Sequence, residues 1–147
     1  MTDISDFARL IPQDDGLCVV STVRPSGTVQ SSVVNAGVLE HPISGATVVG
    51  FVAGGTARKL VNLRARPHTT VVVRAGWQWA AVEGPVELIG PDDRWPGIDA
   101  EGLRVLLRDV FSAAGGTHDD WETYDRAMAD ERRVAVLVTP ERAYSNG

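Results

Sequence analysis

The chain has 147 residues, of which 44% are hydrophobic and 22% charged, and its formal net charge is −5. This length and composition fit one compact domain spanning 1–147 and exclude a disordered or fibrous chain. A single cysteine, Cys18, excludes an internal disulfide framework and a multi-cysteine zinc site. No apolar run approaches the roughly 20 residues of a membrane-spanning helix, and the N-terminal residues lack the features of a signal peptide. We therefore expect a cytoplasmic protein without a membrane partner, and the acidic net charge argues against nucleic acid as a partner.

The first half of the chain is predicted to fold mainly as strands. Its elements, in chain order, are a short helix at 3–10, strands at 17–24, 28–39 and 46–53, and a helix at 56–66. The turn signal of Pro25, Ser26 and Gly27 predicts that the first two strands form a hairpin. Thr56 is predicted to cap the helix at 56–66.

The second half combines strands with two amphipathic helices. Its elements are strands at 69–75 and 78–89, helices at 99–113 and 118–131, and a last strand at 133–140. Gly84 and Pro85 predict a bend or bulge within the strand at 78–89. The segment from Thr117 to Asp120 resembles a capping box for the helix that follows it.

These elements predict a mainly β fold with flanking helices. Short connections between the first strands favour antiparallel pairing, and strands that do not alternate with helices exclude a doubly wound parallel sheet. Six antiparallel strands of this length can close into a small barrel. The most apolar strands, at 46–53, 69–75 and 133–140, predict burial on both faces, by the barrel core on one side and by helices or a second subunit on the other.

Charge is distributed unevenly along the sequence. Residues 1–90 hold seven basic and seven acidic residues, whereas residues 91–147 hold seven and twelve. Between His41 and Val82 there is no acidic residue, yet this stretch holds five cations, namely Arg58, Lys59, Arg64, Arg66 and Arg74. A solvated basic face would explain this cluster, and so would a binding site for an anion.

The segment AGGTARK at 53–59 favours the anion. Arg58 and Lys59, the latter the only lysine of the chain, fall in the first turn of the predicted helix. Cations there oppose the helix dipole at a cost of about 0.3–1 kcal/mol each, unless an anion docks on the free N–H groups of the helix. Gly54 and Gly55 permit close approach of a ligand. We therefore hypothesise a phosphate-bearing ligand, the alternative being that both cations bend away into solvent.

Two strand segments are candidates for binding a planar ring. Trp77 and Trp79 lie two residues apart on the predicted strand, hence on one face, and small residues follow them. Such a pair can form a slot for a ring, or simply part of a core or subunit contact. The strand at 28–39 carries side chains able to hydrogen-bond a heterocycle, although polar strand residues are more often merely solvent-facing: Gln30, Ser31, Ser32 and Asn35.

Other catalytic constellations are not indicated. His41, His68 and His118 lack metal-ligand spacing and are predicted to lie at the surface. Cys18 lies in an apolar strand and is predicted to be a small core residue rather than a nucleophile. No G-x-S-x-G segment is present.

The order of several motifs resembles a known family. The motifs are Q-x-S in the hairpin, RKLVNLRARP after the glycine-containing turn, W-x-W-A-x-x-E-G in a later strand, and H-x-D-W-x-x-Y-x-x-A-M-x-x-x-R-R-V. From about Gly16 to Tyr144 the chain resembles the flavin/deazaflavin oxidoreductases of the pyridoxamine-5′-phosphate-oxidase-like split-barrel superfamily. The likeness is greatest to the actinobacterial B-type branch, which uses coenzyme F420, a 5-deazaflavin.

The resemblance implies a six-stranded antiparallel split β-barrel that forms a homodimer, with two cofactor sites at the interface. Arg58 and Lys59 would hold the cofactor phosphate. The residues implied to surround the ring are Gln30, Ser31, Ser32, Val33 and Asn35, the wall Gly50, Phe51 and Val52, and, from the partner chain, Trp77, Trp79 and Ala80. Ala57 and Val61 stand where this branch often carries further basic residues, so that Arg64 or Arg66 would have to grip the acidic tail of the cofactor.

The function implied is that of an F420-dependent reductase. Reduced deazaflavin would transfer a hydride to a small unsaturated or quinone-like acceptor, and no protein nucleophile or metal would be required. Two alternatives stay open: an FMN-binding oxidoreductase of the same superfamily, and a non-catalytic protein that binds or carries F420.

Overall fold

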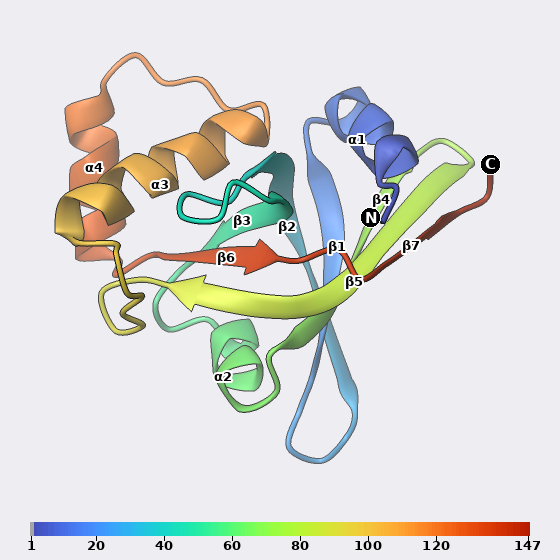
Figure 1. Cartoon of the computed structure of the whole chain (residues 1–147), viewed down its shortest axis with the longest axis horizontal. Coiled ribbons are helices and arrows are strands. Elements are labelled where there is room, and N and C mark those ends of the chain that lie inside the picture. The colour runs from blue at the N-terminus through green and yellow to red at the C-terminus, as the bar shows by residue number, and fades with distance from the viewer. Residues whose placement is uncertain (1) are drawn as a thin grey trace.

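A closed β-barrel forms the body of the protein (Figure 1). The computed structural model describes residues 2–147, and within them seven strands form one sheet: β1 (Leu17–Val23), β2 (Val29–Glu40), β3 (Thr47–Ala53), β4 (His68–Ala75), β5 (Gln78–Ile89), β6 (Val134–Val138) and β7 (Arg142–Ser145). The strand order is β4-β1-β2-β3-β6-β5-β7, and β4 also pairs with β5. Six strands thus close the barrel, β7 extends along β5, and every pairing is antiparallel. The predicted six-stranded antiparallel barrel is confirmed.

β5 changes partners along its length. Its first half pairs with β4 on one edge and with β7 on the other, while its second half pairs with β6. The chain between β6 and β7 passes so close to β5 that a Cβ at Gly84 would lie 1.8 Å from the carbonyl oxygen of Thr139. Gly84 therefore serves a close backbone approach, and the β4–β5 pairing runs through it without a bulge. The predicted last strand at 133–140 ends at Val138, and β7 was not predicted.

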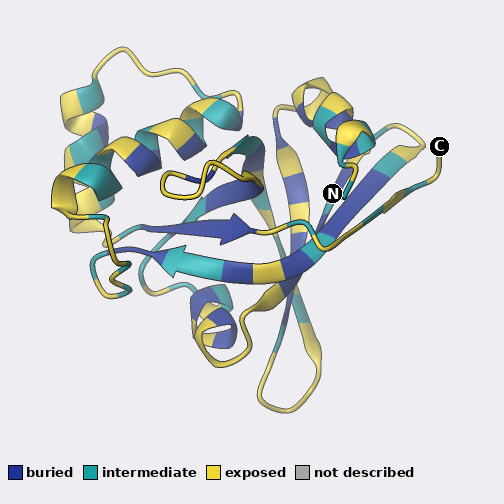
Figure 2. Cartoon of the chain, in the orientation of Figure 1, coloured by how far each residue is buried: buried dark blue, intermediate teal, exposed yellow. Residues whose placement is uncertain are grey.

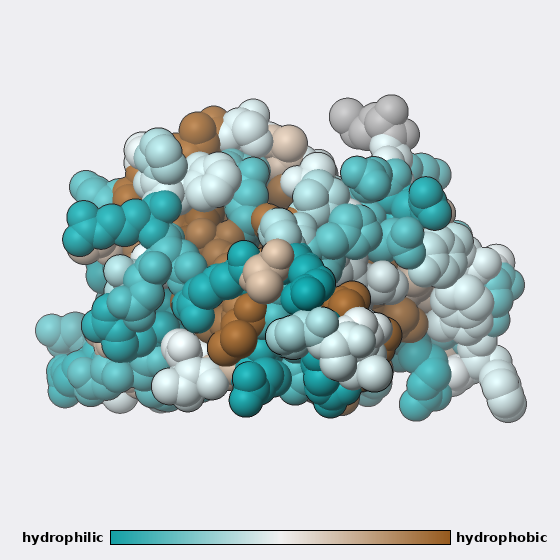
Figure 3. Space-filling view, turned by 90° about the horizontal axis from the view of Figure 1, so that it is seen from below, coloured by the Kyte–Doolittle hydropathy of each residue, from teal (hydrophilic) through white to brown (hydrophobic). Residues whose placement is uncertain are grey.

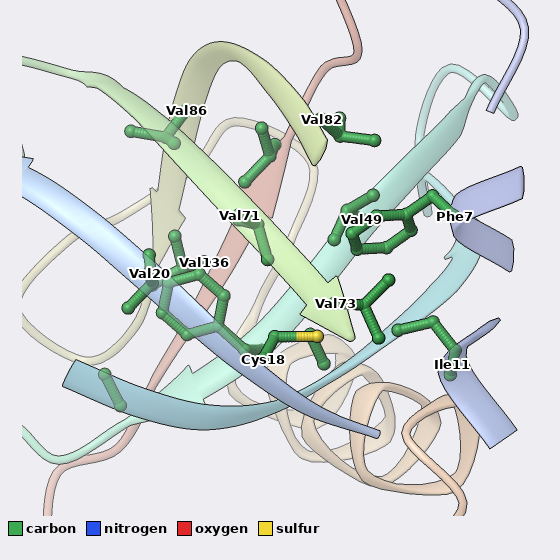
Figure 4. Packing of buried hydrophobic residues seen from close by; sticks show 14 of the residues in the cluster. Phe7, Ile11, Cys18, Val20, Val49, Val71, Val73, Val82, Val86 and Val136 are labelled. Carbon is green, nitrogen blue, oxygen red and sulfur yellow. The ribbon is translucent and has the colours of Figure 1, made fainter. Parts of the chain in front are cut away.

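Helices pack on the barrel from three sides (Figure 1). Within the described residues they are α1 (Ser5–Leu10), which continues into a 3-10 turn, α2 (Arg58–Ala65), α3 (Ala100–Ala113) and α4 (Trp121–Asp130). Phe7 of α1 and Leu60 of α2 belong to the same core cluster as Val71 and Val136 of the strands. Figure 4 shows Phe7, Val71 and Val136 in this core. None of these helices is long and apolar enough to cross a membrane.

The helix starts differ in part from the predictions. Asp99 caps α3 by accepting a hydrogen bond from the backbone N–H of Gly102 at 2.8 Å. α4 starts later than predicted: its cap is Asp120, which accepts from the N–H of Thr123 at 3.1 Å, and the predicted cap at Thr117 is wrong. The predicted Thr56 cap of α2 is also wrong, because the helix starts one residue later and Ala57 occupies the capping position.

The outside of the barrel has two contrasting faces (Figure 2). We define the covered face as the outward residues of β3, β6 and the end of β5, on which α3 packs. Its strand residues in the shared cluster are Val48, Ile89, Ala135 and Leu137. They contact Leu106, Leu107 and Val110 of α3. The helix lies so close to β2 that a Cβ at Gly37 would come within 2.2 Å of the carbonyl carbon of Ala113.

We define the open face as the outward residues of β1, the first half of β2, β4 and the first half of β5. Val19 and Val33 pair across β1 and β2 and are 42% and 64% exposed. Burial on both faces is therefore found for β3 and β6 but not for β4, where Val71 and Val73 are buried and Val72 is partly exposed. The physical reason is that α3 packs on β3 and β6 instead.

Candidate functional site

A cluster of cations lies where α2 starts. Arg58 and Lys59 are the first two residues of the helix, and neither forms an ion pair with any residue in the range 2–147. Ala57 offers no capping side chain, and although the N–H of Leu60 donates to the carbonyl of Ala57 at 3.1 Å, the N–H groups of Arg58 and Lys59 are available to a ligand. The preceding loop is anchored because the N–H of Gly55 donates to the carbonyl of Glu131 at 3.1 Å.

Arg133, the residue directly before β6, joins this cluster. A Cβ at Gly54 would lie 3.8 Å from the guanidinium carbon of Arg133, so the arginine covers this glycine. Burial, and secondarily the positive charge of Arg133, lower the pKa of Lys59. Arg133 has one acidic neighbour, Glu131, at 3.1 Å. Two cations held close together, one of them without an acidic partner in the described chain, form an attractive site for an anion.

No role was predicted for Arg133 from its place in the sequence. It lies far along the chain from Lys59, and only the fold brings the two together. The R-R-V segment was part of the family resemblance, and it was the one signal that marked this position.

A small polar patch lies on the open face beside its apolar row. The hydroxyl oxygens of Ser21 and Ser31 are 2.9 Å apart, and Thr70 is the partner of Ser21 on the opposite strand. The next row on the same face is Val33, Val19 and Val72. Ser21 and Thr70 were not predicted as site residues, although the register of the predicted hairpin would have placed Ser21 opposite Ser31.

Aromatic residues border the open face. Trp79 packs edge-to-face on Tyr144 of β7, with ring centroids 6.2 Å apart and planes at 81°. Tyr144 donates its hydroxyl to Glu83 at 2.9 Å. Trp77 was predicted to lie on the same strand as Trp79, but it does not. It lies with Gly76 in the two-residue turn between β4 and β5 and is 93% exposed. The prediction was wrong because Gly76, at a φ of 61°, and Trp77 together form the turn, so that β5 begins only at Gln78.

The residues predicted on β2 divide between two sides of the strand. Ser31, Val33 and Asn35 point to the open face, whereas Gln30 and Ser32 alternate with them and point inward. Gln30 accepts a hydrogen bond from Nδ2 of the buried Asn62 on α2 at 3.1 Å. Asn35 donates its side-chain amide to the carbonyl of Asp15 at 2.8 Å.

The residues predicted to form the ring wall lie in the core or under α3. Phe51 and Ala80 are core residues, 0% and 1% exposed. Gly50 lies against Leu39, Leu137 and Val110 under α3, and Val52 packs on the α3 cluster. None of the four positions points to the open face, because β3 is covered by α3 and the inner positions are filled by the core.

The two arginines considered for the cofactor tail differ. Arg64 forms a two-pronged ion pair with Asp93, at 2.9 and 2.7 Å, and is therefore committed within the chain. This hydrogen bonding raises the pKa of Arg64. Arg66 is exposed, and no ion pair joins it to a described residue.

His41 and Cys18, the remaining candidates for catalysis, are buried in the fold. His41 is 7% exposed, so its predicted surface position is wrong. Its Nε2 lies 2.5 Å from Oε2 of Glu87, and its Nδ1 accepts from the N–H of Ile43 at 3.1 Å. The ring thereby ties the β2–β3 turn to β5. Cys18 is buried as predicted, and burial raises its pKa to about 12. Residues 2–147 hold no cluster of three or more potential metal ligands.

Known structures share this fold at low sequence identity. A conserved hypothetical protein of Mycobacterium tuberculosis has a TM-score of 0.69 and 18% identity over 99% of this chain and 84% of that one. A structure described as an F420 reductase has a TM-score of 0.59 and 19% identity over 88% and 90%. A pyridoxamine 5′-phosphate oxidase-related, FMN-binding protein of Nostoc punctiforme has a TM-score of 0.61 and 11% identity over 96% and 82%.

No protein-family profile matches the sequence. The structural similarity shows that the chain has the fold of the pyridoxamine 5′-phosphate oxidase-like split barrels. Proteins with different functions share this fold, so a function can be inferred only from the residues of the site.

Proposed function

We propose that this protein is an oxidoreductase that binds a phosphorylated flavin-type cofactor, coenzyme F420, and reduces a small unsaturated or quinone-like acceptor. The observation that carries the proposal is the cluster of Arg58, Lys59 and Arg133 at the start of α2, in which Lys59 has no acidic partner among the described residues. One of the proteins that share the fold is described as an F420 reductase and another as FMN-binding.

The cluster fits a phosphate. An oxyanion at the start of α2 accepts hydrogen bonds from the uncapped N–H groups and lies in the favourable field of the helix dipole. Lys59 and Arg133 supply two charged donors, and charge-assisted hydrogen bonds of this type are about twice as strong as neutral ones. A bound phosphate also offsets the repulsion from Arg133, which after burial is the second cause of the lowered pKa of Lys59.

We assign the ring of the cofactor to the open face, and we propose that a second copy of the chain covers it. The exposed apolar row of Val19 and Val33 needs a partner surface to be buried. Ser21 and Ser31 offer hydroxyls to the polar edge of a ring, and Trp79 borders the same face. The dimer would exclude water from this surface.

The chemistry is that of the cofactor: a reduced deazaflavin supplies a hydride to an electron-poor acceptor. The residues of the chain bind the cofactor, orient its ring and shield it from water. Lys59, Arg58 and Arg133 hold the phosphate, and the serine hydroxyls orient the ring. Cys18 is not suited to serve as a nucleophile at neutral pH, because its thiol is buried and protonated.

Titration with two cofactors tests the proposal. We expect F420 to bind tightly, FMN weakly, and quenching of tryptophan emission to report the binding. Lys59→Ala should weaken F420 binding at least tenfold while changing the affinity for its phosphate-free fragment little, and Arg133→Ala should act in the same direction. Arg126→Ala, an exposed arginine of α4 without an ion pair in the described chain, serves as the matched control.

Each alternative has its own signature in the same experiment. Equal losses of the complete cofactor and its phosphate-free fragment would rule out the phosphate assignment. If the protein is yellow as purified and binds FMN more tightly than F420, its cofactor is FMN and not F420. Tight binding of F420 without turnover over a broad panel of acceptors would indicate a carrier.

A further inference from the structure

A hollow lies away from the open face, between α3, α4 and the segment 90–99. It is a cleft of about 1020 Å³, at the upper end of the size range of small-molecule sites. Its apolar walls include Ile89, Trp95, Ile98, Leu103, Leu107 and Met128. Figure 3 shows apolar surface recessed between hydrophilic residues on the helix-bearing side of the molecule. Of the three cations assigned to the cofactor phosphate, Arg133 also lines this cleft, whereas Arg58 and Lys59 do not.

The loop that walls the cleft is held in place. Its backbone forms two small bridges, between Gly90 and Asp93 and between Trp95 and Ile98. Asp93 is bound by Arg64 of α2, with Nη2 and Oδ2 2.7 Å apart. The preceding Asp92 is bound by Arg132, whose Nε lies 2.9 Å from Oδ2. The cleft is thus preformed, as is usual for small-molecule sites.

Among the charged residues that line the cleft, one arginine has no acidic partner in the described chain. The charged residues are four arginines and two aspartates: Arg94, Asp99, Arg104, Asp125, Arg132 and Arg133. Both aspartates are engaged, Asp99 as the cap of α3 and Asp125 by Arg104 and Arg108. Arg132 is paired with Asp92, Arg133 with Glu131, and Arg104 also with Glu101. Arg94 is the lining arginine that makes no ion pair with a residue of the described chain.

We propose that this cleft is a second binding site, for a small amphipathic anion whose apolar body lies in the cleft and whose acidic group is bound by Arg94. A guanidinium without a partner at the edge of an apolar hollow recognises a carboxylate or sulfonate by charge-assisted hydrogen bonds. Met128 lets the apolar wall adapt to the shape of the body. The proposal does not depend on the identity of the cofactor.

Two dyes that share one aromatic body provide the test of charge recognition. 8-Anilinonaphthalene-1-sulfonate carries the anion, and N-phenyl-1-naphthylamine lacks it. We expect the anionic dye to bind the cleft at least tenfold more tightly than the neutral one, and Arg94→Gln to abolish this preference. Arg126→Gln, on the exposed side of α4 and outside the cleft, should leave it unchanged. Equal affinity of the two dyes for the wild-type protein would overturn the proposal.

Two alanines of α4 locate the binding. Ala129 lines the cleft and is exposed, so Ala129→Trp fills the hollow without emptying the core; Ala127 is exposed on the same helix but does not line the cleft. Ala129→Trp should weaken binding of the anionic dye at least tenfold, and Ala127→Trp should not. In ¹H–¹⁵N spectra the dye should shift the indole signal of Trp95 and leave those of Trp77 and Trp79 in place.

The outcomes are independent of the cofactor proposal. Ala129→Trp should retain F420 binding, and Lys59→Ala should retain dye binding. If Ala129→Trp binds the anionic dye as the wild type does, or if the shifts concentrate on Trp77 and Trp79, the dye occupies the open face and the proposed cleft site is wrong.

Discussion

The covered and the open face belong to one barrel, yet the chain treats them in opposite ways. All five residues of β6 are buried, because the barrel core takes one side and α3 the other. On β1 buried and exposed residues alternate (Figure 2), and Val19 remains 42% exposed. The strands on both faces are rich in valine. Composition therefore does not distinguish the faces; the position of α3 does.

We attribute the stability of the fold to the covered face and the binding of a ligand or second subunit to the open face. The covered face joins two clusters of buried residues into a rigid scaffold. The open face exposes valines beside serine hydroxyls and aromatic rings, an arrangement typical of a surface that binds a ligand or a second subunit. Four experiments test this division, in order of decreasing expected effect.

The largest effect is expected on the covered face. Leu106→Ala removes a side chain that is 2% exposed between α3 and the sheet, and such truncations cost about 2–5 kcal/mol of the free energy of unfolding. Urea denaturation measures the loss. Val105→Ala, at the preceding residue, which lies on the outer side of the same helix and is 43% exposed, should change stability by less than about 0.5 kcal/mol. Similar losses for both variants would contradict the role assigned to this face.

The second experiment concerns the open face. Val19→Lys places a charge in the centre of the proposed dimer interface, where it would lose its hydration without gaining a partner. We expect the dimer to dissociate at least 100-fold more readily, as measured by sedimentation velocity over a concentration series. Val105→Lys, with the same change on the solvent side of α3, should leave assembly intact. A wild-type protein that sediments as a monomer at micromolar concentration would refute the dimer.

A third, smaller effect concerns the ion pairs between α3 and α4. Hydrogen bonds from Arg108 and Arg104 lower the pKa of Asp125. A carboxyl group with a lowered folded pKa stabilises the fold above its unfolded value of about 3.9, and this contribution is lost as the pH falls through the folded pKa. Asp125→Asn should therefore destabilise the protein by about 1–2 kcal/mol at neutral pH.

The pH dependence distinguishes this pairing from a general packing defect. Urea midpoints of Asp125→Asn and wild type should converge as the pH is lowered toward and below the folded pKa. Asp130→Asn, on the same helix and without an ion pair among the described residues, is the control. A difference that persists undiminished in acid would show that the amide disturbs packing instead.

The smallest effect separates the two tryptophans. Trp79→Phe reduces the aromatic contact with Tyr144, and such aromatic pairs contribute about 0.5–1.5 kcal/mol to stability. Trp77→Phe changes a side chain that is 93% exposed and should leave the free energy of unfolding unchanged. Both are measured by urea denaturation monitored by far-UV circular dichroism. Equal losses would mean that Trp77 contacts the fold more than its exposure indicates.

Local patterns predicted most of the fold. Strand and helix positions followed from alternation, from the leucine spacing of α3 and from turn residues at Pro25 and Gly27, because these signals act within a few residues. Errors arose where a single local residue decided the geometry. The turn at Gly76 removed Trp77 from its strand, and Ala57 rather than Thr56 took the capping position of α2.

The candidate site was predicted less completely, because it depends on contacts between distant segments. Lys59 and Arg58 were found from the conflict between their charge and the helix dipole, which is a local effect. Arg133 and the burial of His41 against Glu87 were missed, since each joins parts of the chain far apart in sequence.

The sequence by itself determined the barrel, the order of its elements and the charge at the start of α2. Periodicity and turn chemistry are properties of neighbouring residues, so they can be read along the chain. The tertiary structure alone decided which valine-rich face α3 covers, that Arg133 joins Lys59, and that a cleft opens between α3 and α4. These features arise from packing between distant segments, whose outcome depends on the closure of the whole barrel.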